Sequence, residues 1–276
     1  MKEHTSTCFY ELDKLIGGGL SAGALYVVGA RPAMGKTSFI LNLITNILSQ
    51  ETCERNIIFI STKTNPHEIQ QKITSIVKSI PIDLINSRNN INSEIESIEN
   101  NPVLEKISQG RLMVECTTCP KITDITEIIE RIESNSIKCD ILFIDTLQDF
   151  MQMDKPQVLM NKEYFKAMKI LKKIAQTLQI PIVLSSEVKD TAEKRKGSHM
   201  PLLRDLSGSL EIAKWADVVL FLLRPEYYEL IEKSNDYFTV LNIAKNNYGS
   251  ISSLFLQTEL SCLKFNDEKK FYLDKS

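Results

Sequence analysis

The sequence predicts an α/β protein with a mostly parallel central sheet, helices on both faces of that sheet, and antiparallel strands at its C-terminal edge. Short runs of Ile, Val and Leu alternate with helical stretches over most of the chain, and after residue 216 the apolar runs follow one another without long helices. The 276 residues are 43% apolar, which suffices for one substantial core. No linker rich in Gly, Pro or Ser divides them. We therefore expect residues 1–276 to form a single domain.

The parallel part of the sheet is predicted from five apolar runs separated by helical or irregular sequence. These strands are ALYVVG (24–29), NIIFI (56–60), RLMVE (111–115), CDILFID (139–145) and IPIVLSS (180–186). Continuous apolar runs are typical of strands that are buried on both faces. Amphipathic patterns predict two helices, at KTSFILNLITNIL (36–48) and NKEYFKAMKILKKIAQTLQ (161–179).

Two other regions have a different pattern of apolar residues. ADVVLFLL, DYFTVLNIAK, SSLFLQTE and CLKFN lie close together after residue 216, and we expect them to be antiparallel strands that extend one edge of the sheet. Residues 81–110 are rich in Asn, Ser, Ile and Glu and have no clean period. We interpret that stretch as a helical excursion between two strands.

Composition and charge limit the classes of protein to which this chain can belong. Lys and Arg total 33 against 35 Asp and Glu, so the net charge is -2 and a globally basic nucleic-acid binder is not indicated, although a local basic patch fits this balance. No apolar run approaches the length of a transmembrane helix, and KEHTSTC after Met1 is not a secretory signal. We expect a soluble, cytoplasmic protein with no membrane partner.

The six cysteines are scattered, which fits reduced cytosolic thiols better than a disulfide framework. Cys116 and Cys119 in ECTTCP have CxxC spacing. A zinc site would want a second such pair or nearby histidines, and the three histidines are remote in sequence. We interpret the pair as small buried residues rather than as a metal or redox site.

The stretch GARPAMGKTS (29–38) follows a predicted strand and opens a predicted helix, which is the context of a phosphate-binding loop. Successive backbone N–H groups and the helix N-terminus form a hollow for an anion. Gly35 lets the backbone approach the phosphates, Lys36 supplies a positive charge to them, and Thr37 supplies a hydroxyl to Mg²⁺. The residues expected to hold the nucleotide are Ala30, Arg31, Pro32, Ala33, Met34, Gly35, Lys36, Thr37 and Ser38.

CDILFIDT supplies the partner that such a loop needs. Asp145 ends an apolar strand, and its carboxylate can hold Mg²⁺ through the water shell of the ion. The sequence therefore predicts ATP and Mg²⁺ as cofactors, with Thr37 and Asp145 as the metal-binding residues.

These motifs resemble one known family. CFYELDKLIGGGLSAGALYVVGARPAMGKTSFILNL (8–43) closely resembles the start of the ATPase domain of the DnaB-type replicative DNA helicases, including the alanine at position 30. FIDTLQDF (143–150), RDLSGSLEIAKWADVVLFLLRPEYY (204–228) and LNIAKNNYGS (241–250) resemble three later segments of that family in the same order. The likeness covers nearly the whole chain.

The resemblance implies a RecA-like P-loop NTPase fold, with ATP between neighbouring subunits of a ring, for example a hexamer, and single-stranded DNA in the central channel. It implies partners among replication proteins, such as a full-length helicase. Because the resemblance begins at the family's linker, we expect no N-terminal collar domain within residues 1–276. Residues 1–20 are therefore expected to be a linker segment that leads into the domain.

Three positions depart from the family pattern. Lys63 in STKT stands where the family has its catalytic glutamate, Glu187 in LSSE replaces a sensor glutamine, and Asn247 replaces the arginine finger. Lys245, the other cation that acts on the neighbouring subunit's nucleotide, remains. An ammonium group cannot accept the proton of the attacking water, so we expect hydrolysis near background. Residual activity should depend on Glu187, which could supply the displaced carboxylate or neutralise Lys63 by pairing with it.

The loop KDTAEKRKGSH (189–199) is basic, and a charge run of this kind is more often a solvated face than a binding loop. The family places a DNA-facing loop nearby, so weak contacts of Lys194, Arg195 and Lys196 with single-stranded DNA are expected.

Two functions fit the sequence. The first is an active ring helicase that moves on single-stranded DNA in replication. The second is a nucleotide-binding relative with impaired or lost hydrolysis that serves as a structural or regulatory partner. A third, a recombinase or clock-protein relative sharing only the RecA-like core, is disfavoured by RDLSGSLE and ARPAMGKT.

Overall fold

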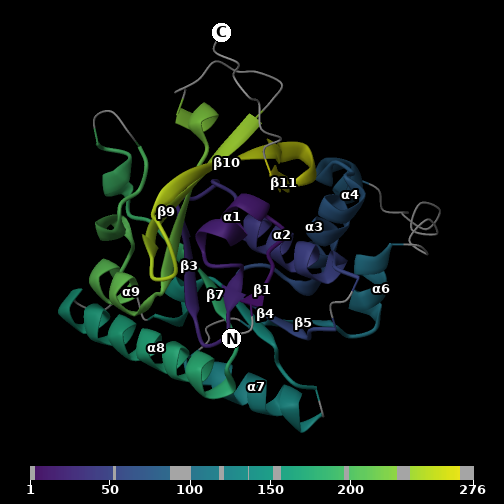
Figure 1. The fold of residues 1–276 in the computed structure, drawn as a ribbon, viewed down its shortest axis with the longest axis horizontal. Coiled ribbons are helices and arrows are strands. Elements are labelled where there is room, and N and C mark those ends of the chain that lie inside the picture. Colours follow the sequence, from purple (N-terminus) through teal and green to yellow (C-terminus); the bar gives the residue numbers. More distant parts are fainter. Residues whose placement is uncertain are drawn as a thin grey trace.

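A single mixed sheet of nine strands forms the centre of the part of the chain that the structure describes (Figure 1). The computed structural model describes residues 4–51, 54–87, 101–117, 121–135, 137–151, 157–195, 199–228 and 237–267. The strand order is β11-β10-β9-β8-β3-β7-β6-β4-β5. The six parallel strands are β3 (Leu25–Ala30), β4 (Ile57–Ser61), β5 (Leu112–Cys116), β6 (Ile141–Asp145), β7 (Ile182–Glu187) and β8 (Val218–Leu223).

The prediction of an antiparallel strand was wrong for ADVVLFLL, which forms β8 and pairs parallel with β3, because it is a continuous apolar run buried on both faces. The other three strands that were predicted to be antiparallel are so, and they lie at one edge. They are β9 (Tyr237–Asn246), β10 (Ser252–Glu259) and β11 (Lys264–Asp267), and β9 pairs with β8. Every residue of β3, β6 and β8 is buried because helices cover both faces there, whereas buried and exposed residues mix along β10. Continuous apolar runs therefore form the parallel strands, and interrupted apolar runs form the antiparallel strands.

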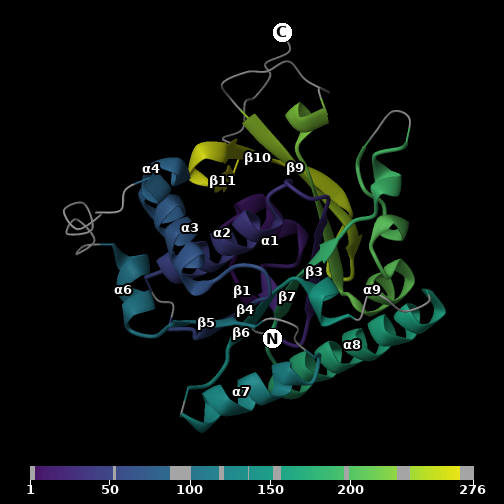
Figure 2. The same cartoon turned by 180° about the vertical axis from the view of Figure 1, so that it is seen from behind.

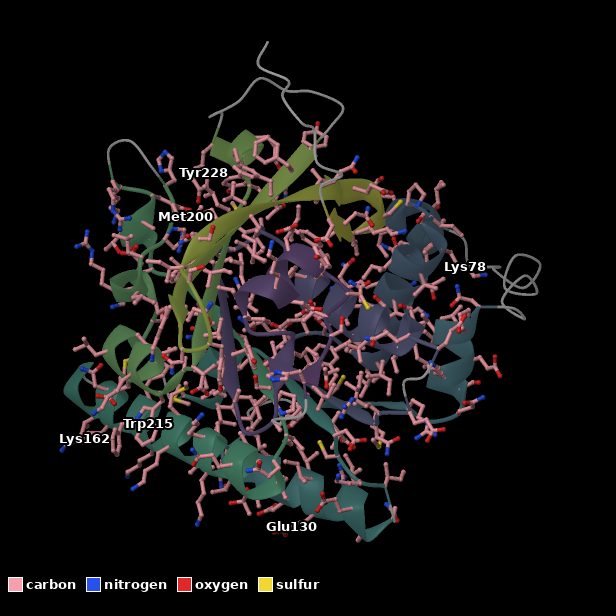
Figure 3. The ribbon with its side chains drawn as sticks, in the orientation of Figure 1. Lys78, Glu130, Lys162, Met200, Trp215 and Tyr228 are labelled. Carbon is pink, nitrogen blue, oxygen red and sulfur yellow. The ribbon has the colours of Figure 1, made fainter. Side chains whose placement is uncertain are left out.

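Helices cover the two faces of the sheet in separate groups (Figure 2). One face packs against α2 (Lys36–Ser49), α3 (Pro66–Lys78) and α6 (Pro102–Ser108), and the other against α7 (Asp124–Ser134), α8 (Gln157–Leu178) and α9 (Ser209–Trp215). The helices carry apolar stripes inward, whereas Glu130 of α7 and Lys162 of α8 point outward (Figure 3). This arrangement confirms the predicted fold class.

The N-terminal segment is packed onto the domain. β1 (His4–Thr5) pairs antiparallel with β2 (Leu20–Ser21), and α1 (Tyr10–Leu15) lies between them in sequence. Phe9, Leu12 and Ile16 are buried in the same core as α2. The segment predicted to lead into the domain therefore contributes to its core.

Other expectations fall only partly on described residues. The excursion over 81–110 contains α4 (Ile82–Ser87) and α6, and its residues 88–100 lie outside the described part. Cys116 of the CxxC pair is exposed at the end of β5, so the prediction of a buried residue was wrong for it, and Cys119 lies outside the described part. Among the helices that are described, none combines the length and the apolar character needed to cross a bilayer.

Candidate nucleotide-binding site

The phosphate-binding loop (residues 29–38) joins the carboxyl end of β3 to the first turn of α2. Gly35 caps α2 with a φ of 88°, in the left-handed region that glycine adopts at no steric cost. A Cβ atom added there would also lie 3.2 Å from the ring of Phe265. The first turn of α2 leaves backbone N–H groups without intrahelical partners, and these are the groups that bind anions at a helix N-terminus.

Lys36 folds back over the loop from which it projects. Its Nζ donates to the carbonyl oxygens of Ala30 at 2.8 Å and of Arg31 at 3.3 Å. Burial lowers the pKa of Lys36 to about 8, although the carboxylates of Asp145 and Glu187 act in the opposite direction. The ammonium group is therefore present at neutral pH but poorly solvated, which favours an anionic partner.

Thr37 and Asp145 meet as the sequence predicts. The Thr37 hydroxyl donates to Asp145 Oδ2 at 2.6 Å, and the Ser185 hydroxyl at the end of β7 donates to the other carboxylate oxygen. Asp145 is buried. Hydroxyl and carboxylate oxygens are ligands that Mg²⁺ accepts. Among the described residues, no group of three or more His, Cys, Asp or Glu side chains is placed to hold a metal ion by itself. The donor set fits an ion held by one carboxylate, one hydroxyl and phosphate oxygens.

Lys63 lies next to two carboxylates where the parallel strands end. Its Nζ is 2.8 Å from Glu187 Oε1 and 3.6 Å from Asp149 Oδ1. Burial alone would lower the pKa of Lys63, but the hydrogen bond and charge of Glu187, together with Asp149, raise it. Lys63 therefore stays protonated. The pairing of Glu187 with Lys63 that the sequence suggested is present.

Asp149 and Gln148 belong to this site but were missed by sequence reasoning. Asp149 accepts a hydrogen bond from Thr62, which also donates to the backbone oxygen of Asp145 at 3.0 Å. Gln148 is buried; its Oε1 accepts from the Glu187 N–H at 2.9 Å, and its Nε2 donates to Ser186 Oγ at 2.9 Å. Both belong to a 3-10 helix after β6 (Leu147–Phe150). The only sequence signal for these two residues was their place in the FIDTLQDF segment.

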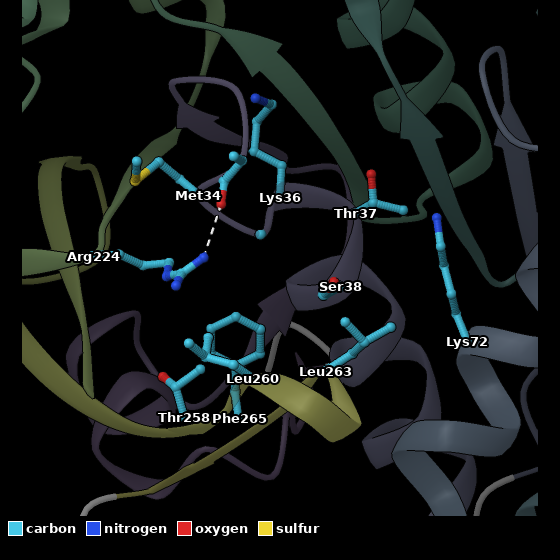
Figure 4. Close-up of a pocket in the computed structure, with 12 residues that line it drawn as sticks. Met34, Lys36, Thr37, Ser38, Lys72, Arg224, Thr258, Leu260, Leu263 and Phe265 are labelled. Carbon is cyan, nitrogen blue, oxygen red and sulfur yellow. Dashed lines mark hydrogen bonds between the residues drawn. The ribbon is translucent and has the colours of Figure 1, made fainter. Parts of the chain in front are cut away.

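A pocket of about 390 Å³ opens beside the phosphate-binding loop. Its far wall comes from the C-terminal strands and includes Thr258, Leu263 and Phe265. Arg224 and Lys72 lie on opposite sides of it (Figure 4). Arg224 Nη1 donates to the Ala33 carbonyl at 3.1 Å. Sequence reasoning missed this wall because its residues lie some 190 or more positions from the loop and share no motif with it.

Two of the three predicted DNA contacts, Lys194 and Arg195, lie on the basic segment (residues 188–195), which follows β7. Lys194 pairs with Asp190 at 2.5 Å, and Arg195 Nη2 donates to both Asp205 oxygens at 2.7 and 2.9 Å. Lys196 lies outside the described residues. Lys189, Lys194, Arg195 and Arg204 line a shallow depression of about 510 Å³ together with Thr191 and Asp205.

The two candidate trans-acting residues make contacts within the chain. Lys245 Nζ donates to the backbone oxygens of Ala213 at 2.8 Å and Ala216 at 2.6 Å, which satisfies the carboxyl end of α9. Burial lowers the pKa of Lys245. The Asn247 amide lies 3.3 Å from Asp217 Oδ1. A single chain does not test a role on a neighbouring subunit, so that role stays a prediction.

Comparison with known proteins agrees with the family resemblance of the sequence. The sequence model of the DnaB-like helicase C-terminal domain matches residues 5–267. A probable plasmid replicative DNA helicase of Chlamydia psittaci is 31% identical over 258 residues, covering 91% of this chain and 53% of that protein. The replicative DNA helicase DnaB of Helicobacter pylori (strain ATCC 700392 / 26695) is 27% identical over 229 residues, covering 83% of this chain and 45% of that protein. The chain thus spans about half the length of the curated relatives it matches.

A solved structure of a DnaB-like replicative helicase, described with its interactions with primase, superposes with a TM-score of 0.83. The two share 20% sequence identity, and the superposition covers 96% of this chain and 62% of that one. At this identity the likeness establishes the fold, which is that of RecA-like helicase ATPase domains.

Proposed function

The chain belongs to the family of DnaB-like helicase C-terminal domains, and on this premise we propose that it is the ATP-binding motor domain of a ring helicase that moves on single-stranded DNA during replication. The observation that carries the proposal is the contact between Thr37 and Asp145 at 2.6 Å, beside the desolvated ammonium of Lys36. Lys36 and Thr37 open α2, Asp145 ends β6, and together they provide what a nucleoside triphosphate with Mg²⁺ requires.

The nucleotide is expected to lie along the loop with its phosphates at the N-terminus of α2. Lys36 leaves the carbonyl groups of Ala30 and Arg31 and contacts the phosphates. The ribose and base then extend toward the pocket wall of Thr258, Leu263 and Phe265, where the guanidinium of Arg224 can lie against a planar base. Thr37 and Asp145 would hold Mg²⁺, which when bound would offset the negative charge of the phosphates.

Hydrolysis should be slow in this arrangement. Attack of water on the γ-phosphorus needs a group that accepts the water's proton, and Lys63 cannot do so. Glu187 is the candidate acceptor, but one of its oxygens pairs with Lys63 at 2.8 Å. The arginine-finger position holds Asn247, which carries no positive charge. We therefore propose slow turnover that depends on Glu187.

DNA binding and ring formation follow from the same premise. Lys194 and Arg195 lie at a basic depression, but each already has a carboxylate partner, so contacts with a strand should be weak and easily displaced by salt. For Lys245 to act on a neighbouring subunit, its ammonium must leave the carbonyl oxygens at the end of α9. We propose that nucleotide at the subunit interface drives this exchange.

One experiment tests the proposal on a single sample. ATP binding and steady-state phosphate release are measured with and without oligothymidylate, for the unaltered protein, Lys36→Ala and Lys166→Ala. Lys166 lies on the exposed face of α8, so it controls for the loss of a lysine. We expect Mg²⁺-dependent binding in the unaltered protein and in Lys166→Ala only. Oligothymidylate that changes neither binding nor release would contradict the helicase assignment.

A further inference from the structure

The side chain of Arg31 belongs to the phosphate-binding loop but bonds to the basic segment. Its Nε and Nη2 donate to the two carboxylate oxygens of Glu193 at 2.9 and 3.1 Å, and its Nη1 donates to the Val188 carbonyl at 2.9 Å. A bidentate pair of this kind fixes orientation as well as distance. Arg31 therefore ties the loop to the basic segment at two points.

The backbone that carries Arg31 is also bonded to the phosphate-binding lysine. Lys36 Nζ donates to the carbonyl oxygens of Ala30 and Arg31, and the Val188 N–H donates to the same Ala30 oxygen at 3.3 Å. Phosphate oxygens compete with these two carbonyl groups for the ammonium of Lys36. Binding of a nucleotide thus alters the hydrogen bonding on the backbone from which Arg31 projects.

Beyond Glu193, the basic segment is held by contacts that reach the next part of the chain. Tyr228 Oη donates to Glu193 Oε1 at 3.4 Å, and the ring of His199 stacks on Tyr228 with 4.5 Å between ring centroids. Tyr228 and Met200 lie in the same region of the molecule (Figure 3). Arg195 donates to the buried carboxylate of Asp205, so movement of the segment carries that side of the basic depression with it.

We propose that the Arg31–Glu193 ion pair is a positioning link that transmits nucleotide occupancy from the phosphate-binding loop to the basic segment. Neither residue touches the reacting atoms. The link sets where Lys189, Lys194 and Arg195 present their charges to a polyanion, and it rests on the proposed function. Releasing Lys36 from the loop carbonyl groups shifts Arg31, and the bidentate pair makes Glu193 and its segment follow.

The test is amide hydrogen exchange of a peptide covering 188–195, with and without saturating AMP-PNP and Mg²⁺. In the unaltered protein, nucleotide should change the exchange rate of this peptide on the order of fivefold or more. In Glu193→Gln, the carboxylate becomes a neutral amide that cannot hold Arg31 in a bidentate pair. We expect nucleotide affinity and the response of the phosphate-binding loop to persist while the response of 188–195 is lost.

Asp190→Asn is the matched control, because it removes one carboxylate from the same segment at a side chain that pairs with Lys194 instead of Arg31. It should respond to nucleotide as the unaltered protein does. A full response of 188–195 in Glu193→Gln, or no response in unaltered protein that has bound nucleotide, would overturn the link alone. Absence of nucleotide binding in calorimetry would overturn the proposed function and the link with it.

Discussion

Replacing Lys63 and Glu187 together should restore hydrolysis in this site. Lys63→Glu with Glu187→Gln places a carboxylate where the family has its base and removes the carboxylate that lies 2.8 Å from the Lys63 ammonium. General-base catalysis contributes about 10²–10⁴ in rate, so we expect the double variant to exceed the unaltered protein by at least about 10²-fold. It should stay below an efficient motor, because the arginine finger absent at Asn247 is worth about 10³–10⁵.

The single variants separate the contributions of the two groups. Lys63→Glu alone places a third carboxylate beside Glu187 and Asp149, and like charges at such distances repel, so its gain should be smaller than that of the double variant. Glu187→Gln alone should lower phosphate release to background. Lys166→Glu, with the same charge change on the exposed face of α8, should leave release unchanged. Rapid release by the unaltered protein that persists in Glu187→Gln would refute the reasoning, since no proposed proton acceptor would remain.

Three further predictions concern pH, DNA and assembly. ATP affinity, measured by calorimetry, should fall by up to about tenfold per pH unit as the pH rises above 8. Burial places the pKa of Lys36 at about 8, and only the ammonium form of Lys36 binds phosphates. Lys36→Arg should lack this pH dependence. Binding of single-stranded DNA should be weak and salt-sensitive, and neutralising Lys194, Arg195 and Lys196 should reduce the salt slope by at most about 2 in fluorescence anisotropy titrations. Nanomolar binding at physiological salt that persists after these three residues are neutralised would contradict a DNA-binding role of the basic segment. In light scattering, micromolar protein should be mainly monomeric without nucleotide and should associate with it, whereas a stable nucleotide-free hexamer would refute this.

The elements that sequence reasoning located are those with strong local signals. The runs of buried Ile, Val and Leu located five of the six parallel strands within about two residues, since a strand covered on both faces needs such a run. The sixth, β8, was located but assigned the wrong direction, because an apolar run does not indicate which neighbour it pairs with. The phosphate-binding loop was recognisable because glycine, lysine and threonine at fixed spacing serve one geometry. Asp145 could be paired with it because both follow strands whose carboxyl ends meet.

The remaining features depend on contacts between distant segments. The strand order placed β7 between β3 and β6, which brought Ser185 to Asp145 and Glu187 to Lys63. Phe265 reached the phosphate-binding loop because β11 lies at the antiparallel edge of the sheet and packs against α2. Glu193 had no local signal at all, since one glutamate in a basic loop predicts no particular partner.

The most direct test of the central claim is calorimetric titration of the unaltered protein with ATP in the presence and absence of Mg²⁺. If Lys36, Thr37 and Asp145 hold the nucleotide as proposed, binding should be micromolar, one to one and strengthened by Mg²⁺. Lys36→Ala should abolish it, because the loop keeps its shape and loses the charge. Failure of the unaltered, folded protein to bind ATP with Mg²⁺, or equal binding by Lys36→Ala, would contradict the claim.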